Sequence, residues 1–462
     1  MSLPNIATPS AQRRRGEYSP HWFDGEFSDW HRFDVGGRSY LLVTDQSRIF
    51  EIDGAAFDEL VHQSGSAQTS AQILAACRIM PTKAIDDQPL ESPPLRSLSL
   101  AVAQKCNLGC TYCYAQEGDF GGTAKKMPLD VALAAVDRLF TDSVPGERVN
   151  LSFLGGEPLI GRNIIRAATR HAVQRGAEHA VRVGFSITTN GTLVTPEDGE
   201  FFEQHGFAVT ISLDGVGETH DRQRSFKNGS GSYEQILANV RPLLAIQRRM
   251  QVSARVTVTP RNLELRKTLD TLVNLGFHSV GFSPMLASPS RRDEMEHEDL
   301  DVMLDQMVNC GGEFERRMIG GERYPFSNMV AAMQELHRGT HRPYPCGAGA
   351  GYLGVSADGG LFACHRFVDD GAGALGSLTQ GIDRAQQSAW LHNRHVHRQE
   401  PCRSCWARYL CGGGCHHEVI HRGRPACDYI RGWLDYCLQA YAHLLMERPD
   451  YFVHDNSLVT PT

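Results

Sequence analysis

Apolar runs rich in β-branched residues alternate with amphipathic segments between residues 98 and 284. Such runs predict buried strands, and segments with an apolar residue every three or four positions predict helices. Six strands are expected, each apart from the last followed by a helix: 98–103, 149–154, 183–189, 208–213, 252–258 and 279–283. Repeated β/α units predict a parallel sheet, curled or open, whose active site lies at the carboxyl ends of the strands.

Prolines and glycines mark the expected helix ends. Pro128 fits the first position of the helix after strand one, and Thr195–Pro196 is a similar helix start. Gly176, Gly206 and Gly276 stand where helix C-caps belong.

The segments on either side of this repeat follow other patterns. Residues 30–63 predict short strands around a Gly36–Gly37 turn, followed by a helix, and residues 86–95 form a linker rich in proline and charge. Residues 340–427 are rich in Cys, Gly and His and have little periodicity. A terminal amphipathic helix is expected over residues 428–446.

Composition narrows the class of protein. The chain has 462 residues, 41% hydrophobic and 21% charged, which suits a globular protein of two or three domains. Its net charge of −7 and pI near 6.3 give no indication of nucleic-acid binding. There is no apolar run long enough for a membrane span, and residues 1–20 lack the apolar core of a secretory signal. We therefore expect a cytoplasmic protein without a membrane or nucleic-acid partner.

Thirteen cysteines are many for such a protein. Without an export signal, they favour metal or cluster ligation over disulfides. Cys77, Cys310 and Cys437 lie on apolar helical faces and are expected to be core residues.

The run CNLGCTYCY places Cys106, Cys110 and Cys113 directly after the first strand of the repeat. A [4Fe–4S] cube has four irons, and this loop can ligate three, which leaves one iron open for a substrate or cofactor. A zinc knuckle is the alternative, but zinc would require a fourth thiolate or histidine close by.

At these residues the chain resembles the radical S-adenosylmethionine (SAM) superfamily. The resemblance implies that the open iron binds SAM and that SAM is cleaved to a 5′-deoxyadenosyl radical. Three further motifs of this family end strands two to four: FLGGEPL (153–159), TTNGT (188–192) and ISLDG (211–215). The resemblance assigns the following residues to the SAM pocket: Gly155, Gly156, Glu157, Asn190, Ser212 and Asp214.

Two further residues are candidate SAM contacts. Tyr114 follows the last cysteine of the loop, where members of the family commonly pack an aromatic ring on the adenine. Arg255, on the fifth strand, could pair with the SAM carboxylate or form a structural ion pair.

A second set of cysteines follows at Cys346, Cys364 and the run PCRSCWARYLCGGGC. Its C-x2-C-x5-C-x3-C core resembles the SPASM extension, which implies two auxiliary [4Fe–4S] clusters and three clusters in all; a zinc ribbon is the alternative. By the family pattern Cys402, Cys405, Cys411 and Cys427 complete one cluster. Cys346, Cys364 and Cys415 then hold the other, and its open iron could bind a substrate thiolate.

Three SPASM subfamilies compete. Anaerobic sulfatase maturases, which form formylglycine, typically have an Asp base after the second SPASM cysteine, where this chain has His365. Thioether-forming peptide maturases have a Cys-His pair there and an acidic, Gly-rich run like QEGDFGG (116–122). His365 is therefore a candidate catalytic residue of a thioether-forming maturase, and the SCIFF (ranthipeptide) maturases are the nearest alternative.

The resemblance implies three domains. Residues 1–90 resemble a winged-helix-like leader-peptide recognition element, 96–300 a partial (β/α)6 radical SAM barrel, and 301–450 a SPASM domain. The implied partners are a small Cys-rich peptide with a leader and an electron donor such as flavodoxin or ferredoxin. An electron-transfer protein or a zinc-binding interaction module would explain only some of the cysteines.

Overall fold

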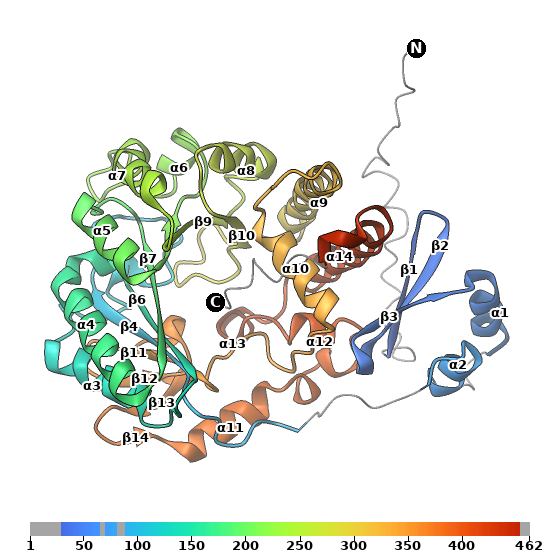
Figure 1. Ribbon diagram of the computed structural model, residues 1–462, viewed down its shortest axis with the longest axis horizontal. Helices are drawn as coiled ribbons and strands as arrows, with labels where there is room; N and C mark the ends of the chain where they lie inside the picture. The colour runs from blue at the N-terminus through green and yellow to red at the C-terminus, as the bar shows by residue number, and fades with distance from the viewer. Residues whose placement is uncertain (1–28, 65–69, 81–87, 453–462) are drawn as a thin grey trace, which may run out of the picture.

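The computed structural model describes residues 29–64, 70–80 and 88–452. The first 28 residues and residues 86–87 of the expected linker lie outside the described residues. Figure 1 shows a curved sheet wrapped by helices, a small β-sheet domain at one side, and C-terminal segments between the two.

The predicted parallel sheet is confirmed. Its six strands are hydrogen-bonded side by side in the reverse of their chain order: β10 (Val280–Pro284), β9 (Gln251–Val258), β8 (Ala208–Ser212), β7 (Arg182–Thr189), β6 (Arg148–Gly155) and β4 (Ser97–Gln104). All neighbouring pairs are parallel. The connecting helices are α3 (Leu129–Phe140), α4 (Arg162–His179), α5 (Pro196–His205), α7 (Tyr233–Ile246) and α8 (Leu265–Asn274). This is the α/β partial barrel expected of the radical SAM fold.

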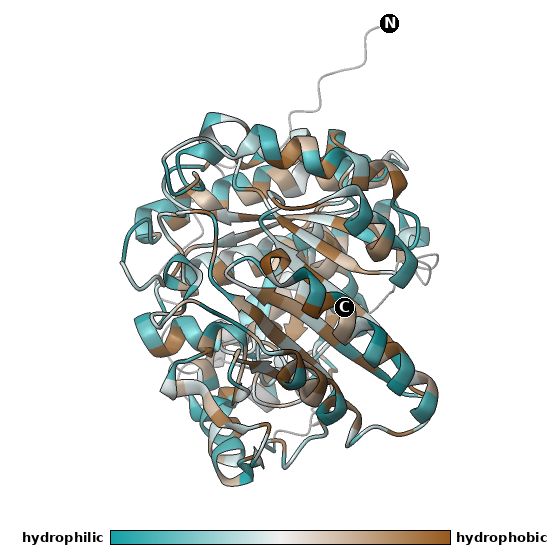
Figure 2. Ribbon diagram, turned by 90° about the vertical axis from the view of Figure 1, so that its left-hand side faces the viewer, coloured by the Kyte–Doolittle hydropathy of each residue, from teal (hydrophilic) through white to brown (hydrophobic). Residues whose placement is uncertain are grey.

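Burial of apolar strands beneath amphipathic helices holds the barrel together. Strand β4 is buried from Leu98 to Gln104, and helix α3 packs Ala135, Val136 and Leu139 against the sheet. Figure 2 shows these hydrophobic strands inside helices whose outer sides are hydrophilic. Each fully buried Leu or Val contributes roughly 1.5–3 kcal/mol relative to an exposed one.

Two of the expected helix ends differ from the structure. Pro128 is the N-cap of α3, one position before the helix, because its extended ψ of 149° is not helical. Gly176 lies inside α4, which continues to a left-handed Ala180. A Cβ on Gly176 would lie 2.8 Å from the Val181 carbonyl oxygen, so this glycine permits close packing rather than helix termination. Gly206 does cap α5, with φ of 63°.

The C-terminal region is more regular than its sequence indicates. Strand β11 (Tyr352–Val355) pairs in parallel with β4 and so extends the barrel sheet. Further antiparallel strands follow: β12 (Gly360–Phe362), β13 (Ala374–Ser377) and β14 (Gly381–Ile382). The helices of the C-terminal region are α9 (His297–Ile319), α10 (Ser327–Arg338), α11 (Arg384–Arg394), α12 (Arg408–Cys411), α13 (His416–Arg422) and α14 (Cys427–Glu447). One further strand, the two-residue β5 (Lys125–Lys126), belongs to the barrel region and pairs with β4.

The N-terminal domain is an antiparallel sheet of β1 (Trp30–Val35), β2 (Arg38–Val43) and β3 (Arg48–Ile52), with α1 (Gly54–Ser64) and α2 (Ser70–Ala76). Its contact with the C-terminal region is specific. The His31 ring stacks on Trp406 at 3.8 Å and its Nε2 lies 2.8 Å from the Asp435 carboxylate. The buried Arg408 donates to Asp45 at 2.6 Å. The domain is therefore fixed beside the cysteine-rich segment that contains Trp406 and Arg408.

The expected core cysteines are confirmed. Cys310 and Cys437 are fully buried in the main core, and Cys77 packs half-buried against the core of the N-terminal domain. Among the described residues, no helix combines the length and apolar character needed to cross a membrane.

Helices α9 and α14 pack closely at a glycine. A Cβ on Gly311 would lie 2.3 Å from the Tyr436 ring, whereas a Cβ on the neighbouring Gly312 would meet nothing within 4 Å. Gly311 is buried and Gly312 is exposed. Two adjacent residues of one helix thus provide a matched test of the packing.

We expect Gly311→Ala to lower the free energy of unfolding by roughly 1–3 kcal/mol, because the added methyl group overpacks the helix contact. Gly312→Ala is expected to raise it by about 0.5–1 kcal/mol, because alanine favours an exposed helix. Denaturant unfolding of both variants measures the difference. Equal effects at the two positions would contradict the proposed packing.

Candidate functional site

The first cysteine loop leaves the carboxyl end of β4 and presents three thiols. Burial raises the pKa of the Cys110 thiol to about 12, and charge on Cys113 and Cys106 adds to the effect. The neighbouring Arg224 opposes this shift. The structure thus brings together Cys106, Cys110 and Cys113, and three partly buried thiols that need a cation to ionise fit a cluster.

Glycine lets the second motif approach this loop. A Cβ on Gly156 would lie 2.5 Å from the Lys105 carbonyl carbon, and one on Gly118 would lie 2.7 Å from Cys106 Cβ. Gly155 has φ of 150° and lies against the Ala103 carbonyl. Larger residues would displace the backbone beside the cysteines.

Glu157 is fully buried at the end of β6. Its carboxylate accepts hydrogen bonds from the Thr189 hydroxyl at 2.7 Å, the Asn190 N–H at 2.8 Å and the Leu159 N–H at 3.0 Å. These donors join the ends of β6 and β7. A carboxylate has about four acceptor positions, so Glu157 retains room for an ammonium donor.

Asn190 connects the third motif to the cysteine loop. Its Nδ2 donates to Asn107 Oδ1 at 2.9 Å and lies 3.7 Å from Cys106 Sγ. Its Oδ1 accepts from the N–H and hydroxyl of Thr192. An amide donor beside a ligand sulfur is one of the interactions that tune iron–sulfur clusters.

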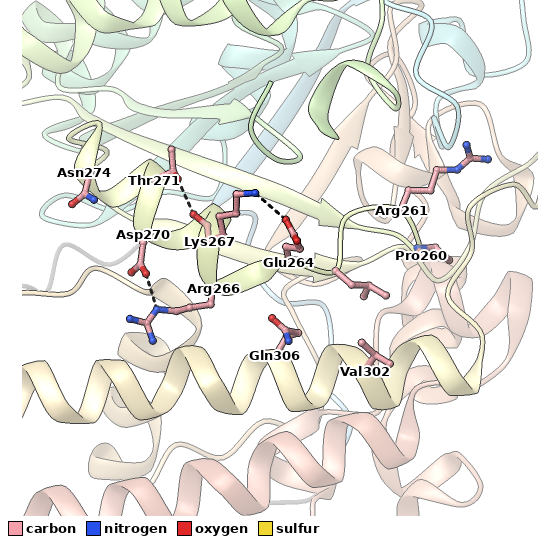
Figure 3. A pocket seen from close by; sticks show the side chains of 11 residues that line it. Pro260, Arg261, Glu264, Arg266, Lys267, Asp270, Thr271, Asn274, Val302 and Gln306 are labelled. Carbon is pink, nitrogen blue, oxygen red and sulfur yellow. Dashed lines mark hydrogen bonds and ion pairs between the residues drawn. The ribbon is translucent and has the colours of Figure 1, made fainter. Parts of the chain in front are cut away.

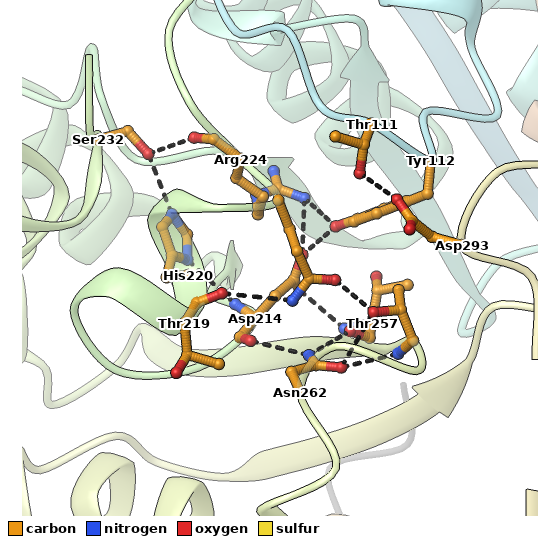
Figure 4. Close-up of polar contacts among 12 residues, drawn as sticks. Thr111, Tyr112, Asp214, Thr219, His220, Arg224, Ser232, Thr257, Asn262 and Asp293 are labelled. Atoms are coloured by element: carbon orange, nitrogen blue, oxygen red, sulfur yellow. Dashed lines mark hydrogen bonds and ion pairs between the residues drawn. The ribbon is translucent and has the colours of Figure 1, made fainter. Parts of the chain in front are cut away.

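Asp214 is at the centre of a buried polar network (Figure 4). Its carboxylate accepts from the hydroxyl of Tyr112, which lies between two of the loop cysteines, and from the Thr257 N–H at 2.8 Å. Arg224 lies 3.5 Å from the Asp214 carboxylate and donates to the Tyr112 hydroxyl at 2.7 Å. Burial raises the pKa of Asp214, which Arg224 and Tyr112 counteract. The Asp214 side chain thus anchors the cysteine loop through its hydrogen bond with Tyr112.

His220, Ser232 and Asn262 extend this network by further hydrogen bonds. His220 Nδ1 accepts from the Asp214 N–H at 3.1 Å, and its Nε2 lies 3.0 Å from the Ser232 hydroxyl. Burial lowers the pKa of His220 to about 3, so its imidazole is neutral. The Asn262 amide donates to the Asp214 carbonyl at 2.8 Å.

The remaining candidate SAM contacts lie around the barrel interior. Ser212 ends β8 directly opposite Arg255 on β9. Arg255 is reached by solvent, while the surrounding protein lowers the pKa of its guanidinium, and it donates to the Ser283 hydroxyl. Tyr114 contacts Phe120 edge-on at 6.3 Å. On the C-terminal side, its ring meets His365 and Arg366.

The later cysteines form two groups that meet at Cys415. One cavity is lined by Cys402, Cys405, Cys411, Cys415 and Cys427. Burial raises the pKa of Cys402 to about 11, and charge on Cys411, Cys427 and Cys405 contributes. These four thiols, which the sequence assigns to one cluster, lie together in the structure.

The second group consists of Cys346, Cys364 and Cys415. Burial raises the pKa of Cys364 to about 12, and charge on Cys415 and Cys346 raises it further. Cys346 is the one exposed residue among the thirteen cysteines. Gly412 makes this grouping possible, because a Cβ there would lie 2.4 Å from the Pro345 backbone beside Cys346.

Arg366 connects the first cysteine loop to this second group. Its guanidinium lies 5.5 Å from the centre of the Tyr114 ring and 3.5 Å from Cys415 Sγ. It also pairs with Glu418 at 2.7 Å. Since Tyr114 follows Cys113, one arginine side chain joins the first cysteine loop to the second group.

His365 lies beside the same contact. Its Nδ1 hydrogen-bonds the Tyr352 hydroxyl at 2.8 Å, and its ring meets that of Tyr114 edge-on at 6.0 Å. Burial, with the charge of Arg366, lowers the pKa of His365 to about 4. The imidazole is therefore neutral near pH 7.

An outer groove of about 800 Å³ lies elsewhere, along α8 and α9 (Figure 3). Its charged residues pair with each other, as Lys267 does with Glu264 at 3.2 Å and Arg266 with Asp270 at 2.8 Å. No cysteine or candidate SAM contact lines it.

Residues 100–272 match the family model of the Radical SAM superfamily. The chain therefore contains the domain of a radical SAM enzyme. The family implies one [4Fe–4S] cluster and SAM, and the loop from Cys106 to Cys113 fits that cluster by its three clustered, buried thiols.

Relatives of this radical SAM enzyme include peptide-modifying maturases. The serine-type anaerobic sulfatase-maturating enzyme of Klebsiella aerogenes is 26% identical over 75% of this chain and 86% of its own length. The radical SAM cyclopropyl synthase TigE of Paramaledivibacter caminithermalis is 23% identical over 73% of this chain and 72% of its own length. The solved structure of native anSMEcpe with bound AdoMet shares the fold, with a TM-score of 0.62, 18% identity and coverage of 76% of this chain and 99% of that one.

The sequence did not single out Arg224, Tyr112, Arg366 or Glu418. Tyr112 stands in the spacer of the cysteine motif, and Arg366 follows the Cys-His pair, so position alone could have drawn attention to them. Arg224 has no such mark, because its partners are distant in the sequence.

We expect Arg224→Met to lower the free energy of unfolding by about 3–5 kcal/mol, because it leaves Asp214 buried without its cation. Anaerobic reconstitution should also load less iron per chain. The matched control is Arg222→Met, since Arg222 is exposed and lies two residues away. Denaturant unfolding and iron analysis compare the variants, and identical values for both would contradict an anchoring role.

Proposed function

We propose that this radical SAM enzyme forms thioether crosslinks within a small Cys-rich peptide, joining cysteine sulfur to a side-chain methylene of Asp or Glu. The substrate we infer is the γ subunit of quinohemoprotein amine dehydrogenase. The segment AVAQKCNLGCTYCYAQEGDFGG (101–122) supports this choice, because it resembles the maturation protein of that dehydrogenase. The SCIFF-type maturases would perform the same chemistry on another peptide.

The observation that carries the proposal is the contact between the first cysteine loop and the group of Cys346, Cys364 and Cys415, which Arg366 makes. Arg366 contacts both the Tyr114 ring and Cys415 Sγ. A peptide between them can expose a C–H bond to the first site and its sulfur to the second. Such positioning converts a bimolecular capture into an intramolecular one.

The cysteine count supports a role in holding sulfur. We propose that Cys346, Cys364 and Cys415 ligate an auxiliary cluster with three thiolates, which leaves one ligand position for the substrate thiolate. The exposure of Cys346 gives access from solvent. The positive charge of Arg366 beside Cys415 favours anionic sulfur there.

When bound, the clusters and SAM supply an electron, a 5′-deoxyadenosyl radical that removes one hydrogen atom, and an acceptor for the electron released as the C–S bond forms. The substrate thiol loses its proton, so each crosslink removes two hydrogens. The residues of the chain place the peptide and exclude water around Tyr114 and His365.

Formylglycine formation is the second candidate, because sulfatase-maturating enzymes are among the relatives. That reaction typically uses an Asp base where this chain has His365. The pKa of His365, about 4, makes its imidazole a weak base near pH 7. Its contacts with Tyr352 and Tyr114 suit a residue that shapes the site.

Mass spectrometry of the γ-subunit peptide after reaction with reduced enzyme and SAM tests the function. We expect the loss of two hydrogens per crosslink and of thiols reactive to alkylation. Cys346→Ala should abolish the crosslink while 5′-deoxyadenosine still forms. Cys77→Ala, which changes a cysteine of the N-terminal core, should leave it intact. An aldehyde on the peptide would instead establish formylglycine formation.

We further propose that the N-terminal domain binds the leader of the peptide. Strand β3 is an edge of its sheet, and an extended peptide can add to such an edge. A groove of about 560 Å³ runs between β3 and the ends of α10 and α14. The stacking of His31 on Trp406 fixes this domain beside Cys405, so a bound leader would direct the peptide core toward the cysteine-rich region.

Two isoleucines of β3 provide a matched test. Both pack on a hydrophobic core, Ile49 on the main core and Ile52 on that of the N-terminal domain, but only Ile49 lines the groove. We expect Ile49→Ala to weaken peptide binding by about tenfold, a loss of about 1.4 kcal/mol, through lost apolar contact. Ile52→Ala should leave affinity unchanged. Fluorescence anisotropy with labelled peptide measures this, and equal affinities for both variants would refute leader binding at β3.

A further inference from the structure

Three side chains of the types that bind metal ions lie together outside the three groups of cysteines. His417 and His421 stand one turn apart on α13, and Asp370 caps the short helix η9 (Gly371–Gly373). Their donor atoms all lie within 4.8 Å of one another. The ligand atoms of a tetrahedral zinc ion, at bond lengths near 2.1 Å, are about 3.4 Å apart. Small side-chain movements would therefore bring these three donor atoms to the spacing of zinc ligands.

The contacts among these side chains already resemble a ligand shell. His421 Nε2 lies 2.8 Å from Asp370 Oδ2, and the two imidazole rings are 4.5 Å apart. The other oxygen of Asp370 accepts from the Ala372 N–H at 2.9 Å, which fixes the carboxylate. Hydrogen-bonded carboxylates of this kind orient metal ligands.

His417 has an unmet bonding requirement. The residue is 9% exposed, and its Nδ1 is buried without a hydrogen-bond partner within the part of the chain that the structure describes. A buried polar atom without a partner destabilises the folded protein, and a bound metal ion would satisfy it. Packing against the Phe367 ring at 5.1 Å holds the imidazole in place but does not satisfy this nitrogen.

We propose that Asp370, His417 and His421 bind one divalent first-row transition ion, such as Zn²⁺ or Fe²⁺. Two imidazoles and one carboxylate are borderline ligands, which favour these ions over Mg²⁺ or Ca²⁺. The nearby cation Arg366 is paired with Glu418, so the carboxylate of Asp370 remains available to balance the ion. His421 and Asp370 are partly exposed, which provides an entry path.

The position of the site indicates its role. Asp370 follows the turn that begins at Cys364, and α13 begins after its N-cap Cys415. An ion held by both segments would fix the separation of these two cysteines. The ion would therefore have a structural role, which is to stabilise the group of Cys346, Cys364 and Cys415. This role does not depend on which peptide the enzyme modifies.

Zinc titration of the full-length protein tests this site. The enzyme is reconstituted with iron and sulfide, treated with a chelator, and titrated anaerobically with Zn²⁺ against a fluorescent zinc indicator. We expect uptake of about one ion per chain with iron retained. His421→Gln and Asp370→Asn should each weaken uptake at least about tenfold, whereas the exposed His392→Gln on α11 should not change it.

X-ray absorption at the zinc edge adds an independent readout. A shell of nitrogen and oxygen alone, lost in His421→Gln, supports the proposal. Sulfur in the shell, or release of iron as zinc binds, would mean that zinc occupies the cysteine sites and would overturn it. Equal uptake by the wild type and both ligand variants would overturn it as well.

Discussion

The burial of cysteine thiols is the constraint on which the structure depends. A cluster ligand must be a thiolate, yet burial raises the pKa of Cys110 and of Cys364 to about 12. Each group of thiols has an arginine nearby, whose positive charge lowers the pKa values of the thiols. Arg224 lies near the first loop and Arg366 near Cys415. Arg424 and Arg431 lower the pKa of thiols in the remaining group.

The strands that lead to two of the cysteine groups belong to one sheet. Strand β4 leads into the first loop at its carboxyl end, whereas β12 runs antiparallel to β11 and leads to Cys364 near the amino end of β4. The contact between Tyr114 and Arg366 joins the two loops. The N-terminal domain is fixed to the same region through Trp406 and Arg408. The proposed peptide binding and sulfur handling would thus share one rigid frame with the radical SAM barrel.

The features that could be predicted from the sequence are those that a local pattern of residues encodes. The six barrel strands are long apolar runs, and the cysteine groups follow regular spacings, so both could be found without a structure. Strands β11 to β14 are two to four residues long and rich in glycine, too short to show a period. Gly176 was misplaced as a cap because a glycine that permits close packing has the same local appearance as one that ends a helix.

Charge partners were the hardest part to predict, because they depend on tertiary contacts. The Tyr112–Arg224 hydrogen bond joins residues 112 positions apart, and no motif links them. The predicted role of Asp214 shows the consequence. Its motif predicts a place in the cofactor pocket, and that assignment stays a prediction. The structure adds the contacts of its carboxylate with Tyr112, Arg224 and Thr257, which no motif indicates.

Divergence within this fold is expected where the two thiol groups meet. The barrel that generates the radical is shared with relatives of low identity. Its Glu157 and Asn190 contacts depend on backbone and nearby side chains, so they tolerate changes elsewhere. His365 and Arg366 instead face Tyr114 across the interface between domains. In the proposed function, a substitution there would alter the charge and proton affinity next to the peptide while the radical machinery stays intact. The residue after Cys364 would then be the position where a common scaffold acquires a new reaction.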